Sequence, residues 1–526
     1  MTKPIQSFFD QPHNGYRLWN PPKGLMTIAQ KDIIFQAPLY KQDDSQQLKE
    51  RYLVLTDQHL FYLKSEREPE ILAIMKTDWV RCDYLIKKVK GGYIYTIRFI
   101  RNMRYTDLVT YDEEHFKEWK KHLVLVFLQC DFHQKFNTIK MIGKGSFARV
   151  YLVEDKFTGR RYAVKAFSKE YLLSQPKGKD SLLNEILVMK KLNHENIMKL
   201  EEIHESKNSI YLVLELLQGG ELLNYMTYKK RLGHDEIHNV MKCLLHALNY
   251  MADKNIMHRD LKPDNIILKK KSNLSQAVLK LVDFGLATPC DVDEYLFKRC
   301  GTPGFVAPEI ILAPSKQNIH YSSKCDVFSA GIIFYILLTN RSPFEGKTFK
   351  EILQKNKECK INFNLTPLMN NKLAFDLLKK MLEKDVDRRI SAKEACSHPY
   401  LVGESKQMQV EETEQKSDES YMKGYQKQIE IMKKNVNWNN SLVIRDHLIN
   451  GNIDTLQEDF NQRGFINSFK SMCSPKIQNK KKFNKRESIL KYVLIQNAKK
   501  NLADIYSQEN FFEEKFSSQQ EMDYLF

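Results

Sequence analysis

Paired cysteine motifs, membrane-length apolar runs and nucleic-acid-binding modules are all missing from this sequence. Its nine cysteines are scattered without metal-ligand spacing, so neither a zinc site nor a disulfide framework is expected. The strongly apolar stretch at 330–338 is far shorter than a membrane span, and no apolar signal lies near the amino terminus. These absences favour a reducing, cytoplasmic compartment. We assign the 330–338 stretch to a buried helix.

Charge is abundant and unbalanced. Lysine and arginine number 82 against 65 aspartates and glutamates, which gives a formal net charge of +17. Such a surplus favours partners rich in phosphate or carboxylate, although a lysine-rich surface is also commonly just solvated. Without a zinc spacing or another nucleic-acid module, a nucleic-acid partner is not expected. A chain of 526 residues predicts two or three domains.

The most informative stretch lies near the middle of the chain. Residues 258–265 read His-Arg-Asp-Leu-Lys-Pro-Asp-Asn, and Asp-Phe-Gly follows at 283–285, one strand-length later. Together these two motifs supply a proton acceptor and two cation ligands, which are the groups that phosphoryl transfer needs. In this order they resemble a eukaryotic protein kinase, and the resemblance extends over residues 136–401.

The resemblance implies a role for each polar group. Asp260 would accept or orient the proton of the substrate hydroxyl, and Lys262 would reach the transferring phosphate. Asn265 and Asp283 would hold the magnesium ions that accompany ATP. The implied cofactors are therefore ATP and Mg²⁺.

The residues that the resemblance implies for ATP binding precede these motifs in the chain. A glycine-rich hairpin would fold its backbone amides over the phosphates, and alanine replaces the usual third glycine with another small residue. Lys165 would contact the α- and β-phosphates with Glu185 as its ion-pair partner, while Glu215 and Leu217 would offer backbone groups to adenine. The hairpin residues are Ile142, Gly143, Lys144, Gly145, Ser146, Phe147, Ala148, Arg149 and Val150.

Two further features bear on the substrate. The run Cys-Gly-Thr-Pro at 300–303 resembles the end of a serine/threonine kinase activation segment, with Thr302 expected near the catalytic aspartate. The hinge at 214–222 is close in style to calcium/calmodulin-dependent kinases. There Glu221, assisted by Asp264, would bind an arginine three residues before the phosphoacceptor, because guanidinium and carboxylate match bidentately. The alternative is that Glu221 only caps or solvates the next helix.

The sequence indicates less about regulation than about catalysis. An arginine beside the catalytic aspartate, here Arg259, normally implies an anion in the activation segment. The usual phosphothreonine position, two residues before the Cys-Gly-Thr-Pro run, is Lys298. We hypothesise that fixed carboxylates replace the phosphate, and Thr288, Tyr295 and Thr302 remain alternative phosphate acceptors. The candidate carboxylates are Asp291, Asp293 and Glu294.

Residues 30–130, which follow an amino-terminal segment at 1–29, are strand-rich and end in a helix. Strand-like runs stand at 51–55, 60–63 and 93–100. In the stretch 113–123, Phe116, Trp119 and Leu123 recur at helical spacing, so Trp119 is expected in the core. Strands closed by one tryptophan-bearing helix resemble a pleckstrin homology domain, and a generic β-rich domain is the alternative.

Pleckstrin homology domains bind phosphoinositides when basic residues of their first two strands converge on the head group. Lys41, Lys49 and Arg51 have that spacing and would make charge-assisted contacts to the phosphates of a lipid head group. Recruitment to a membrane would follow. A protein-docking surface, including one for the kinase domain of the same chain, is the alternative.

The tail has a different character. Residues 402–420 are polar enough to form a flexible linker, and helical patterns return over 421–526. The basic, amphipathic stretch 480–495 is similar to the regulatory segments of calmodulin-dependent kinases, which occupy their own kinase groove or bind calmodulin. A solvated packing helix is the alternative.

The sequence thus predicts an α+β chain: a bilobal protein kinase fold preceded by a small β-barrel or sandwich domain and followed by a mostly helical tail. The predicted reaction is transfer of the ATP γ-phosphate to serine or threonine of protein substrates. Two rivals remain open, a pseudokinase scaffold and a lipid-binding adaptor with incidental kinase activity. The intact set of polar residues argues against the scaffold.

Overall fold

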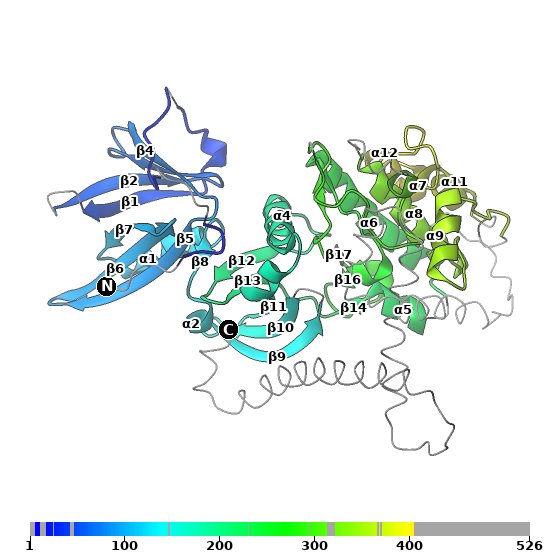
Figure 1. Cartoon of the computed structure of the whole chain (residues 1–526), viewed down its shortest axis with the longest axis horizontal. Coiled ribbons are helices and arrows are strands. Elements are labelled where there is room, and N and C mark those ends of the chain that lie inside the picture. The colour runs from blue at the N-terminus through cyan, green and yellow to red at the C-terminus, as the bar shows by residue number, and fades with distance from the viewer. Residues whose placement is uncertain are drawn as a thin grey trace, which may run out of the picture.

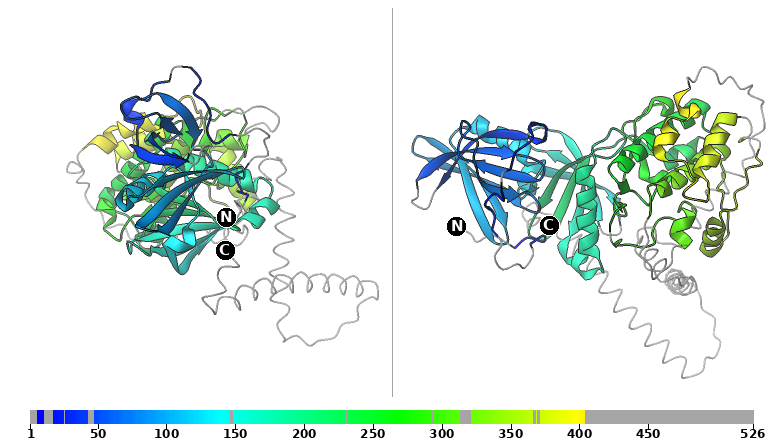
Figure 2. Two further views of the ribbon diagram at one scale, coloured as in Figure 1. Left: turned by 90° about the vertical axis from the view of Figure 1, so that its left-hand side faces the viewer. Right: turned by 90° about the horizontal axis from the view of Figure 1, so that it is seen from above.

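The computed structural model describes residues 6–10, 17–24, 26–42, 47–145, 148–229, 231–292, 294–312, 321–365, 368 and 371–403. They form an amino-terminal β-rich unit, a sheet-rich small lobe and a helical large lobe, which follow one another along the long axis (Figures 1 and 2). The predicted tail at 421–526, its basic stretch and nearly all of the predicted linker lie outside the described residues.

The amino-terminal unit is antiparallel and ends in a helix. Its strand order is β4-β3-β2-β1-β7-β6-β5, and the three strand-like runs of the sequence fall within β2, β3 and β6. The elements are η1 (Gln30–Asp32), β1 (Phe35–Gln42), β2 (Leu48–Leu55), β3 (His59–Leu63), β4 (Ile71–Lys76), β5 (Arg81–Val89), β6 (Gly92–Arg101), β7 (Arg104–Thr110) and α1 (Glu113–Leu123).

Helix α1 closes the core of this unit, as the sequence predicts. Asp112 caps it by accepting a hydrogen bond from the backbone N–H of His115 at 3.0 Å. Phe116, Trp119 and Leu123 form its buried face, and Trp119 is fully buried. The prediction of a core tryptophan on a helix over 113–123 is therefore confirmed.

A two-residue strand joins the amino-terminal unit to the small lobe. Strand β8 (Leu128–Gln129) lies parallel to β5 on one side and to β12 on the other. The described strands of both units therefore form one thirteen-stranded sheet. The sequence does not predict this junction, because two residues are too few to show a strand pattern.

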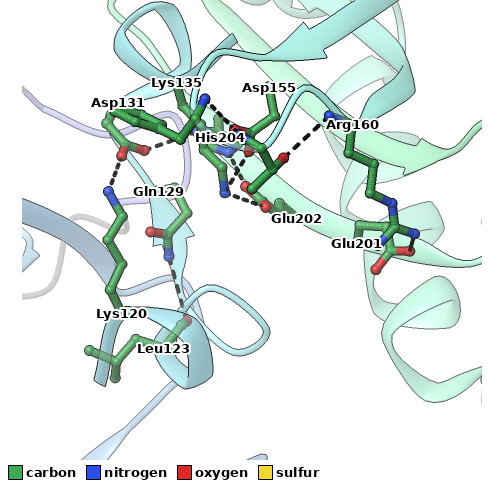
Figure 3. A network of polar contacts seen from close by, with 12 residues as sticks. Lys120, Leu123, Gln129, Asp131, Lys135, Asp155, Arg160, Glu201, Glu202 and His204 are labelled. Carbon is green, nitrogen blue, oxygen red and sulfur yellow. Dashed lines mark hydrogen bonds and ion pairs between the residues drawn. The ribbon is translucent and has the colours of Figure 1, made fainter. Parts of the chain in front are cut away.

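Buried charges reinforce the same junction. We call Lys120, Asp131, Lys135, Glu202 and His204 the junction cluster (Figure 3). Asp131 pairs with Lys120 at 2.8 Å and lies 3.4 Å from His204, whose Nε2 donates to Glu202 at 2.8 Å. Lys135 pairs with Glu202 at 2.5 Å. These contacts link α1, α2 and β12.

Opposing effects set the acidity of the two carboxylates in the junction cluster. Burial alone would raise the pKa of Asp131, but Lys120 and His204 outweigh burial and lower it. Burial likewise opposes ionisation of Glu202, and the hydrogen bond from His204 with the charge of Lys135 lowers its pKa. Both groups are therefore held as carboxylates at neutral pH.

The small lobe continues the sheet in the order β12-β13-β11-β10-β9 and adds two helices. Its longer helix, α4, lies beside the sheet and faces the large lobe (Figure 1). The elements are α2 (Phe132–Lys135), β9 (Phe136–Lys144), β10 (Ala148–Asp155), β11 (Arg161–Ser168), α3 (Lys169–Ser174), α4 (Gly178–Lys191), β12 (Leu200–Glu205) and β13 (Ser209–Glu215).

Helices dominate the large lobe. They are α5 (Leu222–Tyr228), α6 (His234–Asp253), α7 (Pro308–Leu312), α8 (Lys324–Thr339), α9 (Phe349–Glu358), α11 (Lys372–Met381), α12 (Ala392–Cys396) and α13 (Pro399–Val402). Short strands and turns lie against them: β14 (Gly220–Glu221), β15 (Ile256–Met257), η2 (Pro263–Asn265), β16 (Ile266–Leu268), η3 (Leu274–Gln276), β17 (Leu279–Leu281) and β18 (Thr288–Pro289).

Helix α8 is the centre of this lobe. Every residue from Cys325 to Thr339 is buried, as expected of a helix that is apolar on all sides. The interpretation of 330–338 as a buried helix is confirmed. Within the described part of the chain, no helix combines the length and the apolar character needed to cross a membrane.

Candidate active site

The catalytic loop follows β15 and leads into η2 between the two lobes. We call Asp260, Lys262, Asn265 and Thr302 the catalytic cluster. Thr302 donates to one carboxylate oxygen of Asp260 at 2.6 Å, and Lys262 Nζ donates to the other at 2.9 Å. Asn265 Nδ2 donates to the backbone oxygen of Asp260 at 2.8 Å and to its carboxylate at 3.3 Å. A single carboxylate is thus held by three neighbours.

The charge of Lys262 depends on the same carboxylate. Burial alone would lower the pKa of Lys262, but the nearby negative charges of Asp260 and Asp264 raise it above its usual value. Lys262 also approaches Thr302 Oγ1 at 3.2 Å. A cation, a carboxylate and a hydroxyl are therefore brought together at one point in the large lobe.

Asp326 anchors this loop from inside α8. Its carboxylate accepts hydrogen bonds from the backbone N–H groups of His258 at 2.7 Å and Arg259 at 2.8 Å. Burial raises the pKa of Asp326, and these two bonds oppose that effect. Arg259 has φ of 65°, a left-handed conformation uncommon for residues other than glycine. The two bonds hold the loop in this strained conformation.

Lys165 reaches the site from strand β11 of the small lobe. Its Nζ lies 2.7 Å from Glu185 on α4 and 3.5 Å from Asp283. Burial alone would lower the pKa of Lys165, but these two carboxylates raise it. The pairing requires α4 to lie against the sheet with Glu185 facing inward.

Two further contacts, one from α4 and one from Lys177 immediately before it, are not predicted by the sequence. Asn184 Nδ2 donates to the backbone oxygen of Ala287 at 2.6 Å, and Lys177 Nζ donates to that of Leu296 at 2.8 Å. Both contacts tie α4 to the segment after Asp-Phe-Gly. Single polar residues on a helix carry no signal for such contacts, because the partner carbonyls are placed only by the tertiary fold.

Asp283 and Asn265 are the candidate magnesium ligands, and their chemistry fits the ion. Mg²⁺ prefers oxygen ligands and is commonly bound through one or two protein groups together with phosphates. The side chain of Asp283 is 53% exposed, with φ of 63° at its backbone. Because the amide nitrogen of Asn265 donates to Asp260, its amide oxygen is the atom that can bind a cation. Among the described residues, no group of three or more His, Cys, Asp or Glu is arranged so that it could hold a metal ion.

The glycine-rich hairpin is formed by β9 and β10. Gly143 pairs with Val150, and Lys144 pairs with Arg149. A Cβ at Gly145 would lie 3.4 Å from the backbone oxygen of Ala148, which is van der Waals contact. Ile142 is half exposed and Ala148 is buried. Ser146 and Phe147 at the tip lie outside the described residues.

The hinge begins where β13 ends. Glu215 uses its side chain to accept from the backbone N–H of Lys199 at 2.7 Å and to pair with Lys280 at 2.6 Å. Its carboxylate is thereby directed into the fold, which leaves adenine contacts to the backbone. Leu217, two residues further on, lies between β13 and β14.

Glu221 lies at the beginning of α5, with its side chain making no capping hydrogen bond. Its backbone pairs with Ile267 of β16, the strand that follows η2 and the catalytic loop. Asp264 lies in η2 itself. The strand pairing therefore places Glu221 on the same lobe as Asp264, on the side that carries the catalytic loop. The capping interpretation of Glu221 is not supported.

Arg259 is satisfied by the activation segment. Its Nε donates to the backbone oxygen of Leu286 at 3.0 Å and one terminal nitrogen to that of Phe297 at 2.7 Å, and its guanidinium lies 5.3 Å from the ring centre of Tyr295. Glu294, one of the residues expected to neutralise Arg259, pairs with Lys298 instead, at 3.3 Å. Asp293 lies outside the described residues.

A second arginine fixes the end of the activation segment. The guanidinium of Arg389 is fully buried and binds both carboxylate oxygens of Glu309, at 2.7 and 2.9 Å. The bidentate geometry makes this a strong pair. It joins α7 to the loop that precedes α12.

Of the three predicted lipid-binding residues, Lys41 lies on β1, and Lys49 and Arg51 lie on β2. Lys41 and Lys49 are directly opposite one another across the two strands. Lys41 lies 5.1 Å from the ring centre of Tyr62, whose hydroxyl accepts from Arg51 Nε at 3.1 Å. One tyrosine on β3 therefore contacts two of the three predicted lipid-binding residues.

Comparisons with known proteins agree with this geometry. A family model described as protein kinase domain matches residues 136–401. Calcium-dependent protein kinase 4 of Plasmodium falciparum is 38% identical over 51% of this chain and 50% of its own length. Myosin light chain kinase A of Dictyostelium discoideum is 37% identical over 49% of this chain and 85% of its own length.

A third relative is the probable serine/threonine-protein kinase fhkC of Dictyostelium discoideum, 35% identical over 51% of this chain and 44% of its own length. The chain thus spans half or less of two of these three relatives. Each match is about as long as the stretch of residues that the family model covers. The chain belongs to the protein kinase family, and residues 136–401 are its serine/threonine kinase domain.

Proposed function

We propose that this protein transfers the γ-phosphate of ATP to serine or threonine residues of other proteins. The observation that carries the proposal is the placement of Asp260, held by Thr302, Lys262 and Asn265, opposite the Lys165–Glu185 pair of the small lobe. A phosphoryl acceptor and a nucleotide could then meet between the lobes. The groups that phosphoryl transfer requires are present on both sides.

The reaction follows from these positions. The substrate hydroxyl oxygen forms a bond to the γ-phosphorus as the bond to the ADP oxygen breaks, and Asp260 receives the hydroxyl proton. Lys262 is placed to neutralise charge on the transferring group, and Lys165 to bind the α- and β-phosphates. Asn265 and Asp283 would hold Mg²⁺, which supplies charge neutralisation on the phosphate oxygens when bound.

The substrate preference rests on Glu221 and Asp264. Both are acidic, and β14 brings the first beside the strand that follows the catalytic loop. We infer that the two carboxylates bind an arginine on the amino-terminal side of the phosphoacceptor. Guanidinium and carboxylate form bidentate, charge-assisted hydrogen bonds, so arginine would be preferred to lysine.

For the amino-terminal unit we propose a pleckstrin-homology-like role in recruitment from the cytoplasm to phosphoinositide-containing membranes. Seven antiparallel strands closed by α1, with Lys41 on β1 and with Lys49 and Arg51 on β2, support the proposal. Liposome pelleting with and without these charges tests it. Equal pelleting of the wild type and a Lys49→Ala/Arg51→Ala variant would make the unit a protein-docking surface instead.

For the tail we propose that the basic stretch 480–495 binds calmodulin or the groove of its own kinase domain. The support is its basic, amphipathic sequence, together with the calcium-dependent kinases among the relatives. Truncation near residue 402 distinguishes an inhibitory tail, whose loss raises activity, from an activating one, whose loss lowers it.

The deciding experiment is phosphate incorporation from ATP into an arginine-directed serine peptide library. Wild type, Asp260→Ala and the truncated chain are compared. Activity that disappears in Asp260→Ala establishes the enzyme. ATP binding without activity in any form would favour a pseudokinase scaffold.

A further inference from the structure

A short amino-terminal segment is buried between the two sheet-bearing units. Residues 7–10 read Ser-Phe-Phe-Asp, and Ser7, Phe8 and Phe9 are only 5%, 8% and 3% exposed. The segment is a compact turn. The N–H of Ser7 donates to the carboxylate of Asp10 at 2.8 Å, and the N–H of Phe9 donates to Ser7 Oγ at 3.1 Å. Neither the kinase motifs nor the predicted lipid site uses it.

A buried carboxylate binds the first two residues of this turn. Glu205, at the end of β12, accepts from Ser7 Oγ at 2.6 Å and from the backbone N–H of Phe8 at 2.6 Å. The same carboxylate pairs with Lys169 at the start of α3 at 2.7 Å and lies 3.9 Å from Arg81 of β5. Glu205 therefore connects the segment to both units.

The rings of the two phenylalanines pack against an aromatic side chain and a cationic side chain. The ring of Phe9 stacks on Trp79 with centroids 4.6 Å apart and planes 9° from parallel. Trp79 has φ of 58°, a left-handed conformation rare for so large a residue. Lys179, in the first turn of α4, lies 5.1 Å from the ring centre of Phe8. The amino-terminal unit and α4 thus contribute one contact each.

The last residue of the segment is hydrogen-bonded to a hairpin turn. Asp10 accepts a hydrogen bond at 2.8 Å from the backbone N–H of Asn102, in the turn between β6 and β7. Asn102 and Met103 both have positive φ, as the tight turn requires. Every residue from Ser7 to Asp10 therefore has a specific partner outside the segment, contributed by the amino-terminal unit or the small lobe.

We propose that this junction is a binding site for a peptide turn with the pattern Ser-Phe-Phe-Asp, and that residues 7–10 of the same chain are its ligand. Occupancy would hold the start of α4 through Phe8 and Lys179, and so keep Glu185 against Lys165. The binding part of the proposal is independent of the proposed function; the effect through α4 rests on it. The hydrogen bonds within the turn offset part of the conformational freedom that a free peptide loses on binding.

The test uses the full chain carrying Phe8→Ala and Phe9→Ala, with a fluorescent peptide of residues 1–10. Fluorescence anisotropy should show saturable binding to the variant and at least about tenfold weaker binding to the wild type, whose tethered segment competes at high effective concentration. Phosphate transfer by the variant should be about tenfold below the wild type, and saturating peptide should restore most of it.

Two matched controls separate the site from general damage. A peptide with Phe9→Ala should neither bind nor restore activity, and the full chain with Phe157→Ala, an exposed aromatic elsewhere in the small lobe, should behave as wild type. Should the double variant fail to fold in a thermal melt, Asp10→Ala removes only the contacts to Asn102 and Ser7. It should bind the peptide more tightly than the wild type does.

Each outcome of these experiments tests one part of the proposal. If the two peptides bind the variant equally, or neither binds, the site is overturned. Specific binding with unchanged phosphate transfer overturns the link to α4. Specific binding to a chain that phosphorylates nothing, wild type included, supports the site while it removes the proposed function.

Discussion

The catalytic cluster and the junction cluster are both buried and both charged, yet they differ in what surrounds them. In the catalytic cluster, Lys262 lies within electrostatic reach of Asp283, whose side chain is 53% exposed. In the junction cluster, Asp131, Glu202 and His204 contact one another and two lysines, and each of the three is less than a tenth exposed in its side chain. Enclosure on all sides indicates a structural role. An exposed neighbour indicates a site that a ligand can reach.

The sharpest test of this difference is Asp260→Asn. Removing the proton acceptor should lower kcat by about three orders of magnitude, within the usual range for a general base. The melting temperature should fall less than in Asp131→Ala, because the asparagine oxygen can still accept from Thr302 and because Asp264 and Asp283 remain near Lys262. Steady-state kinetics and calorimetry measure the two quantities, with Asp253→Asn at the end of α6 as the control. A large drop in melting temperature with a normal kcat would mean that Asp260 has a structural role and not a catalytic one.

The opposite result is expected at the junction. Asp131→Ala leaves Lys120 without its carboxylate partner and leaves His204 with Glu202 alone. It should lower the free energy of unfolding by about 2 to 3 kcal/mol, somewhat below the value for a fully buried pair because Lys120 is partly exposed. Kinetic constants of the folded enzyme should change little. Urea denaturation measures the loss, and Glu114→Ala on the exposed face of α1 should show none.

The two clusters also differ in what the sequence reveals. Chemistry fixes the residue types and spacing around Asp260 and Asp283, so the candidate site is readable from short motifs, as is the α1 helix from its apolar spacing. The junction is not readable, because Asp131 and His204 are ordinary residues far apart in the chain and β8 has only two residues. The sequence does not predict the burial of segment 7–10 for the same reason: its partners Glu205, Trp79, Lys179 and Asn102 come from four separate elements and loops.

A smaller effect is expected at the proposed substrate site. Glu221→Gln should lower kcat/KM for an arginine-containing peptide by about tenfold, since a charge-assisted bidentate pair becomes a neutral one. The same variant should treat an arginine-free peptide as the wild type does. A fall on both peptides would mean that Glu221 supports α5 rather than the substrate.

The smallest effect is the response to acid. The pKa values of Asp131 and Glu202 are lowered in the folded chain, so the unfolded chain binds protons first as the pH falls. Their stabilisation is complete above the ordinary carboxyl range of about 4 and is lost as the pH falls through their lowered values. Urea denaturation between pH 6 and pH 3 should therefore show a steeper loss in the wild type than in Asp131→Ala. Equal slopes would mean that other carboxylates dominate.

Strand β8 has a mechanical consequence. Because it is hydrogen-bonded to β5 on one side and β12 on the other, any rotation of the small lobe over the large lobe must sweep the whole amino-terminal unit through an arc. The amino-terminal unit would then act as a lever, and its far end would move through a longer arc than the nucleotide-binding side of the small lobe. Anchoring that end to a surface would resist the swing, so the place where the protein is tethered would set how easily its lobes open and close.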